Sequence, residues 1–259
     1  MKRLFAALPL LLMLPCHALE WRDSPEIGRL FEQAGAEGTF VVLDVAQQRL
    51  IGHDRARAVR RFVPASTFKI PNTLIGLTVG AVGDVDEVLP YGGKPQPVKD
   101  WERDMSLREA VRVSNVPVYQ ELARRIGLER MRDGVARLEY GNARIGSIVD
   151  SFWLRGPLAI SAVEQVQFLA KLAAGALPFP REAQARVREI IRLEAHEGAV
   201  LYGKTGWGNG DPGIGWWVGW VEKDGRAYPF ALNMDIRDAS DAAKRVALGK
   251  ASLRALRVY

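Results

Sequence analysis

Two residues with complementary chemistry, Ser66 and Lys69, lie three positions apart in the stretch Ser66-Thr67-Phe68-Lys69. If Ser66 opens a helix, this spacing places both side chains on one face, one turn apart. A serine hydroxyl is a weak nucleophile until a neighbouring group takes its proton. Apolar surroundings from Phe68 and Ile70 can lower the pKa of Lys69 by ~3–5 units, because burial disfavours the charged ammonium. The pair therefore predicts a serine nucleophile served by a basic lysine, with no histidine involved.

A second group of polar residues follows far downstream, in Lys204-Thr205-Gly206 at the end of an expected strand. Lys204 offers a positive charge, Thr205 offers a hydroxyl donor, and Gly206 lets a substrate backbone approach closely. A second cation can come from the pair Lys244-Arg245 in the last helix. Arginine is the better carboxylate ligand because its fork can bind with two parallel hydrogen bonds, but the residues alone leave both Lys244 and Arg245 as candidates.

Proton transfer and charge stabilisation require further groups. Ser114, in Ser114-Asn115-Val116 after a short capped helix, could relay a proton toward a leaving group. An acyl intermediate needs an oxyanion hole, for which the backbone N–H groups of Ser66 and Trp207 are candidates. At a helix N-terminus the free N–H groups around Ser66 favour negative charge. Pro71 removes one donor from that helix, so we expect a kinked first turn.

The N-terminal segment, residues 1–18, has the pattern of a secretory signal. A basic start precedes an apolar stretch over residues 4–14, which is too short to span a bilayer easily, and Cys16-His17-Ala18 fits a cleavage site. The alternative is a lipoprotein acylated on Cys16, which Pro15 disfavours. After cleavage the mature chain, residues 19–259, has no cysteine. Disulfides, thiol catalysis and cysteine-bound zinc are then excluded.

Other kinds of site find little support in the sequence. The two remaining histidines, His53 and His196, are isolated and form no metal-binding pattern, so we expect no metal ion. The segment Gly208–Gly213 fits G-x-G-x-x-G, but a Trp-rich strand follows it where a dinucleotide site needs a helix.

The net charge of +6 comes from scattered arginines in a chain that is 48% hydrophobic and 25% charged. This composition predicts a solvated globular surface and no nucleic-acid partner.

Hydrophobic periodicity and capping signals give the expected elements. We expect helices at residues 24–34, 66–79, 106–114, 117–126, 128–138, 161–175, 180–193 and 239–256, and strands at residues 39–45, 50–53, 199–204, 215–221 and 228–234. The order predicts an α+β fold, in which an antiparallel sheet is flanked by the terminal helices and carries an inserted all-helical lobe at roughly residues 66–195. Residues 19–259 would form one catalytic domain.

Taken together, the motifs resemble those of a known family. S-x-x-K with a downstream K-T-G is the signature of serine β-lactamases and penicillin-binding proteins. The full set closely resembles the class D serine β-lactamases, or oxacillinases, over essentially the whole mature chain: Ser66-Thr67-Phe68-Lys69, Ser114-Asn115-Val116, Tyr140-Gly141-Asn142, Trp153 and Lys204-Thr205-Gly206. The resemblance implies a serine β-lactamase or transpeptidase-like fold. It also implies hydrolysis of penicillin-type β-lactams through an acyl-enzyme on Ser66, resistance to these antibiotics, and a periplasmic location.

The resemblance also assigns roles to individual residues. It implies that carbon dioxide carboxylates Lys69 to N6-carboxylysine, whose carbamate is the general base in acylation and deacylation; no other cofactor is implied. Trp153 would steady the carbamate through its indole N–H, and Tyr140-Gly141-Asn142 would be structural. The remaining roles are proton transfer by Ser114 and Lys204, an apolar wall from Val116 and Leu154, and substrate binding by Thr205, Gly206, Trp207 and Arg245.

Two alternatives share part of this signature. A penicillin-binding D,D-peptidase or transpeptidase typically has S-x-N, where this chain has Val116. A non-hydrolysing β-lactam sensor domain would stay acylated, but such domains are attached to membrane-spanning segments, and the mature chain shows none. We therefore expect small-molecule β-lactams as the partners, with no membrane association of the mature form and no indication of its oligomeric state.

Overall fold

The computed structural model describes residues 19–259, so the predicted signal segment lies outside the described residues. A seven-stranded sheet forms the centre, with strand order β1-β3-β2-β9-β8-β7-β6. Its strands are β1 (Glu20–Asp23), β2 (Gly38–Asp44), β3 (Arg49–His53), β6 (Arg192–His196), β7 (Ala199–Gly208), β8 (Gly213–Lys223) and β9 (Arg226–Ile236). All neighbours are antiparallel except β1 and β3, which run parallel. The sheet is therefore mixed, and the prediction of an antiparallel sheet was wrong for its edge strand β1.

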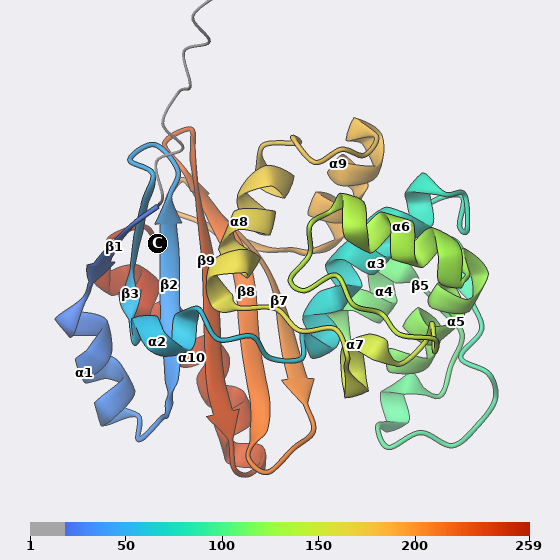
Figure 1. The fold of residues 1–259 in the computed structure, drawn as a ribbon, viewed down its shortest axis with the longest axis horizontal. Coiled ribbons are helices and arrows are strands. Elements are labelled where there is room, and N and C mark those ends of the chain that lie inside the picture. The colour runs from blue at the N-terminus through green and yellow to red at the C-terminus, as the bar shows by residue number, and fades with distance from the viewer. Residues whose placement is uncertain (1–18) are drawn as a thin grey trace, which may run out of the picture.

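Helices cover both faces of this sheet (Figure 1). On one face lie α1 (Pro25–Gln33) and α10 (Ala239–Ala255), as predicted for the terminal helices. Their contact with the sheet is close: a Cβ added at Gly249 of α10 would lie 2.1 Å from the ring of Trp217 in β8. The opposite face is covered by α8 (Ala162–Ala173) (Figure 1). This helix falls within the range predicted for the helical lobe, yet it packs on the sheet.

The helical lobe lies beside β7 (Figure 1). It contains α3 (Lys69–Thr78), α4 (Leu107–Arg112), α5 (Val116–Ile126), α6 (Leu128–Arg137), α7 (Phe152–Arg155) and α9 (Arg181–Ile190), together with the short pair β4 (Val88–Leu89) and β5 (Met105–Ser106). Its core is built around α3, whose Leu74 and Ile75 are fully buried. A Cβ at Gly134 of α6 would lie 2.8 Å from Ile75, so these two helices pack with their backbones close together. Between β3 and α3 lie the short helix α2 (Arg55–Ala58) and the 3₁₀ turn η1 (Ala65–Phe68).

Local sequence signals correctly marked several element boundaries. Ser106 and Ser161 both accept a hydrogen bond from the backbone N–H three residues on, in capping boxes completed by Glu109 and Glu164. The turn between β8 and β9 has positive φ at Asp224 and at Gly225 (50° and 70°), as a tight hairpin requires.

Two predicted boundaries were wrong near the sheet edge. The helix expected at residues 180–193 ends at Ile190, and β6 follows because residues 192–196 pair with β7. The strand expected to end at Lys204 continues to Gly208, since it pairs with β8 along its whole length. Lys204-Thr205-Gly206 therefore lies inside a strand. The segment Gly208–Gly213 forms the β7–β8 connection.

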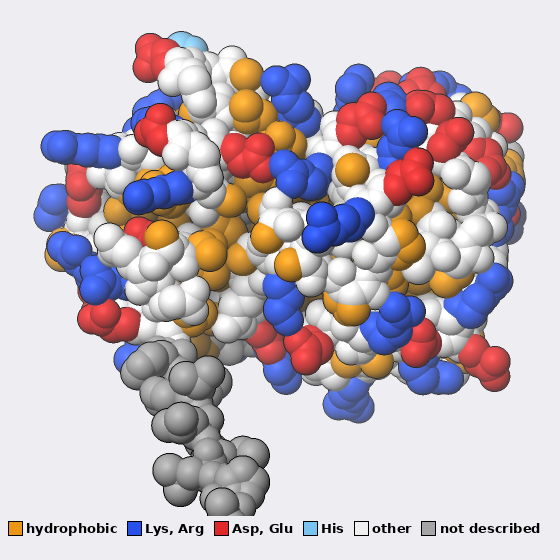
Figure 2. All heavy atoms as spheres, turned by 90° about the horizontal axis from the view of Figure 1, so that it is seen from above, with side chains coloured by type: hydrophobic (Ala, Val, Ile, Leu, Met, Phe, Trp, Pro, Cys, Tyr) orange, Lys and Arg blue, Asp and Glu red, His pale blue; other side chains and the backbone are white. Residues whose placement is uncertain are grey.

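The surface carries charges of both signs. Figure 2 shows Lys and Arg side chains interspersed with Asp and Glu over the face that it presents. Several form ion pairs, such as Arg124 with Asp150 at 2.8 Å. Exposed pairs of this kind contribute only ~0–1 kcal/mol to stability each. Within residues 19–259, no helix has both the length and the apolar character needed to cross a membrane.

Candidate active site

Ser66 lies in the turn η1, directly before α3. Ala65, the residue before it, has a positive φ of 49°, so the backbone turns sharply just ahead of the serine. Because the 3₁₀ turn passes into α3 at Lys69, Pro71 is the third residue of that helix. A helix needs no intrahelical partner for N–H groups in its first turn, so Pro71 fits there. The expected kink is thus replaced by a change of helix type.

Lys69 and Ser66 face each other inside the protein. The Nζ of Lys69 donates a hydrogen bond to the Ser66 Oγ at 3.0 Å, and Lys69 is only 1% exposed. The ring of Tyr119 lies beside the lysine amine, with its centroid 5.0 Å from the Lys69 Nζ. Burial, and then the nearby charge of Lys204, hold the pKa of Lys69 well below its ordinary value. The lowered pKa favours the neutral amine, which can accept the serine proton.

Trp153 supplies a buried donor and packs on Phe68, the residue before Lys69. It lies on α7, is fully buried, and stacks on Phe68 with ring centroids 5.5 Å apart. Within the described part of the chain its Nε1 is buried and has no hydrogen-bond partner. A buried N–H left without an acceptor costs ~1–3 kcal/mol. The indole N–H is therefore available to an acceptor that the protein atoms do not supply.

Lys204 and Ser114 form a second pair, which joins β7 to the segment between α4 and α5 of the helical lobe. The Nζ of Lys204 donates to the Ser114 Oγ at 2.9 Å and to the backbone oxygen of Thr205 at 2.9 Å. Burial, and then the charge of Arg245, lower the pKa of Lys204 to about 7. Both of its protonation states are therefore populated near neutral pH, so this pair can pass a proton in either direction.

The strand β7 packs directly against η1. A Cβ added at Gly206 would lie 3.1 Å from the Pro64 carbonyl oxygen and 3.1 Å from the Thr67 Cγ2, so a larger residue would push the two apart. Trp216 of β8 strengthens this contact, because its Nε1 donates to the Val63 carbonyl at 2.9 Å. These contacts bring the serine turn and the Lys204-Thr205-Gly206 strand side by side.

Arg245 is the cation of α10 that reaches this strand. Its Nη1 donates to the Gly206 carbonyl, and its guanidinium lies 5.9 Å from the ring centroid of Trp207. Lys244 instead binds Asp241 within α10 at 2.8 Å. Trp207 is 47% exposed and stands at the rim of the site. The geometry thus places Arg245, and not Lys244, beside the predicted substrate-binding residues.

Comparison with known proteins identifies the family. A model of the penicillin-binding protein transpeptidase domain matches residues 38–254. The chain is 43% identical over 219 residues to the β-lactamase OXA-5 of Pseudomonas aeruginosa. The aligned residues cover 83% of this chain and 82% of that protein. The chain is 39% identical over 242 residues to OXA-48 of Klebsiella pneumoniae, covering 93% and 91%. The chain belongs to the class D β-lactamases.

A solved structure of the family agrees with this fold. The class D β-lactamase FUS-1 (OXA-85) from Fusobacterium nucleatum subsp. polymorphum superposes with a TM-score of 0.88 at 43% identity, covering 92% of this chain and 99% of that one. The serine β-lactamase or transpeptidase-like α+β fold predicted from the motifs is therefore confirmed.

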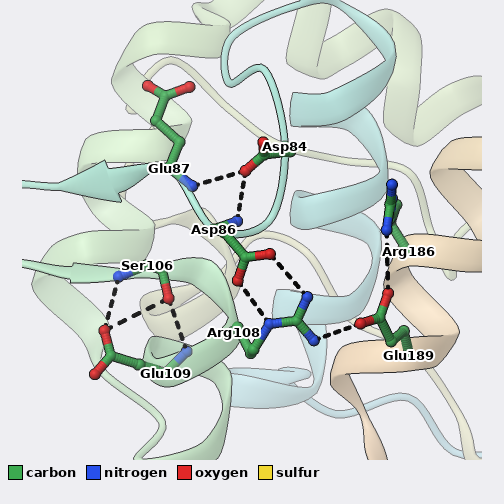
Figure 3. A network of polar contacts seen from close by, with 8 residues as sticks. All are labelled: Asp84, Asp86, Glu87, Ser106, Arg108, Glu109, Arg186 and Glu189. Atoms are coloured by element: carbon green, nitrogen blue, oxygen red, sulfur yellow. Dashed lines mark hydrogen bonds and ion pairs between the residues drawn. The ribbon is translucent and has the colours of Figure 1, made fainter.

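In this class D β-lactamase an ion network holds α4, the helix that leads to Ser114. Figure 3 shows Arg108 of α4 between Asp86 and Glu189. Its Nε and Nη2 donate to the two oxygens of Asp86 at 2.6 and 2.9 Å, and its Nη1 donates to Glu189 of α9 at 2.7 Å. The three partners are far apart in the sequence, so no local pattern indicated the network.

Gln165 of α8 is a further supporting residue that the sequence analysis missed. Its Nε2 donates to the Thr67 Oγ1 at 3.0 Å, and its Oε1 accepts from the Tyr140 hydroxyl at 3.3 Å. Thr67 in turn donates to the Pro64 carbonyl at 2.8 Å. Asn142 ties its own loop to the segment before α8 by accepting from the Ala159 N–H at 3.1 Å. Tyr140-Gly141-Asn142 is thus linked to the serine turn through Gln165.

The two residues predicted as an apolar wall are both partly buried. Val116 begins α5, and Leu154 lies on α7 and packs on the core of the helical lobe. Val116 is placed by the cap of its helix, because the Oδ1 of Asn115 accepts from the Val118 N–H at 3.0 Å. Leu154 follows Trp153 on α7, and Val116 follows Ser114 and Asn115 at the start of α5.

Proposed function

We propose that this class D β-lactamase hydrolyses the β-lactam amide of penicillin-type antibiotics through an acyl-enzyme on Ser66. The observation that carries the proposal is the hydrogen bond of 3.0 Å between the Lys69 Nζ and the Ser66 Oγ, made by a lysine with a lowered pKa. A nucleophile within reach of a base is the geometry that covalent acyl transfer needs. The curated relatives bearing the name β-lactamase support the choice of substrate.

In acylation, Lys69 removes the proton of Ser66 as its oxygen attacks the lactam carbonyl. The backbone N–H groups of Ser66 and Trp207 would bind the oxygen on which negative charge develops. As the ring opens, its nitrogen needs a proton. Lys204 supplies it through the Ser114 hydroxyl, to which it is bonded at 2.9 Å. A lysine with a pKa of about 7 is suited to give and regain a proton near neutral pH.

Substrate binding uses the strand β7 and its neighbours. Arg245 and Thr205 would bind the carboxylate of the antibiotic, since both present donors near Gly206. Gly206 would contact the substrate through its backbone. Apolar side chains would enclose the rest of the molecule and limit water access: Val116, Leu154 and Trp207.

We also propose that Lys69 is carboxylated by carbon dioxide. Only a neutral amine attacks carbon dioxide, and burial lowers the pKa of the Lys69 amine, which favours its neutral form. The Nε1 of Trp153, a buried donor without a partner in the described residues, is suited to bind the added carboxylate. The carbamate would supply an anionic general base for both acylation and deacylation. The residues present therefore fit the modification.

The biological setting follows from the N-terminal pattern and the activity. If residues 1–18 direct secretion, the mature enzyme acts in the periplasm and confers β-lactam resistance. A D,D-peptidase or transpeptidase is the second candidate, favoured only by the match to the transpeptidase domain model. Such enzymes typically have asparagine at the third position of this motif, where the present chain has Val116.

A turnover experiment tests the proposal. Purified mature protein is mixed with excess chromogenic cephalosporin, with Ser66→Ala as the control. A β-lactamase hydrolyses many equivalents, and the control hydrolyses none. A burst of one equivalent that leaves a stable adduct on Ser66 would instead indicate a transpeptidase or a sensor domain.

A further inference from the structure

The catalytic hydroxyl of Ser114 is carried by an unfavourable backbone conformation. Ser114 joins α4 to α5 and has a φ of 57°, in the left-handed region that residues other than glycine rarely adopt. The N–H of Asn115 donates to the Ala110 carbonyl at 2.8 Å. This is the 6→1 bond of a Schellman helix end, with Ser114 in the position that glycine usually occupies. Something outside the turn must hold a serine there.

Trp101 is bonded to both residues that flank Ser114. Its indole Nε1 donates to the Val113 carbonyl at 2.9 Å, and its own carbonyl accepts from the Asn115 Nδ2 at 3.2 Å. Trp101 ends the 3₁₀ turn η2 (Lys99–Trp101), twelve or more residues earlier in the chain. The two bonds therefore clamp the Ser114 turn from a separate segment.

Asn115 connects this clamp to α5. It is fully buried, and its Oδ1 caps α5 through the Val118 N–H at 3.0 Å. Its Nδ2 donates to Trp101 and lies 3.5 Å from the Met105 Sδ. The backbone and both ends of the side chain are thus engaged. The helix cap uses only the Oδ1 of Asn115, so the bond from its Nδ2 to Trp101 is not needed for capping.

We propose that Asn115 and Trp101 are positioning residues that hold the Ser114 hydroxyl against Lys204 for proton transfer. The inference rests on the proposed function, because it assigns Ser114 to the acylation step. The hydroxyl reaches the Lys204 Nζ at 2.9 Å only while the left-handed turn persists. Relaxation of the turn toward a right-handed conformation rotates the serine side chain away from the lysine. Neither positioning residue needs to touch the substrate.

A double-mutant cycle tests this coupling. Asn115→Ser keeps a side-chain oxygen for the helix cap but loses the amide donor to Trp101. We measure the rate of Ser66 acylation in single turnovers by mass spectrometry, with and without Ser114→Ala. Asn115→Ser alone should slow acylation by about 10-fold or more, part of the ~10²–10⁴-fold that a placed proton-transfer group contributes. On the Ser114→Ala background the further loss should be less than about 2-fold, because coupled residues are not additive.

Equal losses on the two backgrounds would overturn the inference, as would no loss from Asn115→Ser alone. The dissociation constant of the noncovalent complex gives a second readout. This constant should stay within about 2-fold of the wild type, because Asn115 and Trp101 act on proton transfer and not on the binding of the substrate. A parallel loss of affinity in Asn115→Ser would indicate a collapsed site and contradict the positioning role.

Trp101→Phe provides a variant from the other side of the clamp. It keeps an aromatic ring but removes the indole donor to Val113, and it should reproduce the non-additivity with Ser114→Ala. The matched control is Gln184→Ala on α9, which removes a buried amide that donates to the carbonyls of Leu177 and Phe179. This control should lower the melting temperature without slowing acylation. If it slows acylation as much as Asn115→Ser does, general destabilisation explains the effect and the proposal fails.

The single-turnover design separates this inference from the proposed function. Acylation of Ser66 is measured whether or not the acyl-enzyme is later hydrolysed. Absence of multiple turnovers in the wild type refutes the β-lactamase proposal, whereas additivity in the cycle refutes the clamp.

Discussion

The Lys69 Nζ and the Ser66 Oγ are 3.0 Å apart, and the lysine is only 1% exposed. The turn η1 creates this relationship by leading directly into α3, so that the two side chains lie on the same face. Burial then lowers the pKa of the amine, and this turns an ordinary cation into a base. The serine and its base are thus products of the same short segment.

Replacement of this base gives the most direct test of the mechanism. Lys69→Ala should lower turnover by ~10²–10⁴-fold, because it removes the group that accepts the serine proton. Slow acylation of Ser66 can persist in the variant. Steady-state kinetics and the intact mass of the protein after exposure to penicillin measure the two steps. Turnover at the wild-type rate would refute the assignment of Lys69 as the base.

Carboxylation of Lys69 can be observed independently of activity. Protein incubated with ¹³C-labelled bicarbonate should show a carbamate resonance in its ¹³C NMR spectrum, and Lys69→Ala should not. Trp153→Phe should weaken this signal at a given bicarbonate concentration, because it removes the buried donor that would bind the carboxylate. Because carbon dioxide reacts with the neutral amine, acidic or carbon-dioxide-depleted buffer should inactivate the wild type, and added bicarbonate should restore it. An unchanged signal in Trp153→Phe would contradict the role of the indole.

The lowered pKa of Lys204 predicts how stability depends on pH. Its pKa is about 7 in the folded protein against an ordinary 10.5, so between these values unfolding takes up a proton. The free energy of unfolding should therefore rise with pH across this window, by about 1.4 kcal/mol per pH unit for such a group. Denaturant titrations at several pH values measure the slope. Lys204→Met should reduce it, and an identical slope in both proteins would show that Lys204 stays protonated when folded.

The sequence was most informative where spacing alone determines geometry. Ser66 and Lys69 are three residues apart in one helical segment, so their proximity required no knowledge of the tertiary structure. The capping boxes at Ser106 and Ser161 were equally local. The long apolar strands of the central sheet were found because their composition is distinctive, although β7, β8 and β9 extend beyond the predicted ends.

What the sequence did not reveal depends on contacts between distant segments. The edge strands β1 and β6 are short and polar, and they become strands only because a neighbour pairs with them. The bond between Gln165 and Thr67 joins residues 98 positions apart. The clamp of Trp101 on the residues around Ser114 was invisible for the same reason. Sequence analysis therefore found the reacting groups but not most of the residues that hold them in place.

The neighbours Lys244 and Arg245 offer a matched pair for testing substrate binding. Arg245 contacts the Gly206 carbonyl, whereas Lys244 is bonded to Asp241. Arg245→Ala should raise KM for penicillins by about 10-fold or more, since a charged hydrogen bond contributes ~1.5–3 kcal/mol. Lys244→Ala should leave KM within about 2-fold of the wild type, because the Lys244 ammonium is bonded to Asp241 and not to the strand that carries Gly206. Equal effects from the two substitutions would contradict the assignment of Arg245.

The backbone strain at Ser114 predicts a trade between stability and activity. At a φ of 57° glycine is unstrained, whereas a residue with a Cβ loses ~1–2 kcal/mol. Ser114→Gly should therefore raise the free energy of unfolding by about 1 kcal/mol. Glycine's greater freedom in the unfolded chain makes this gain smaller than the full strain energy. The same substitution should also slow acylation by ~10²-fold, because the proton relay from Lys204 is lost.

Ser114→Ala is the control: it loses the same hydroxyl but keeps the Cβ, so it should be equally slow without being more stable. Denaturant unfolding and single-turnover acylation distinguish the two variants. If Ser114→Gly is no more stable than Ser114→Ala, the turn is not strained, and the serine occupies this position at no cost to the fold.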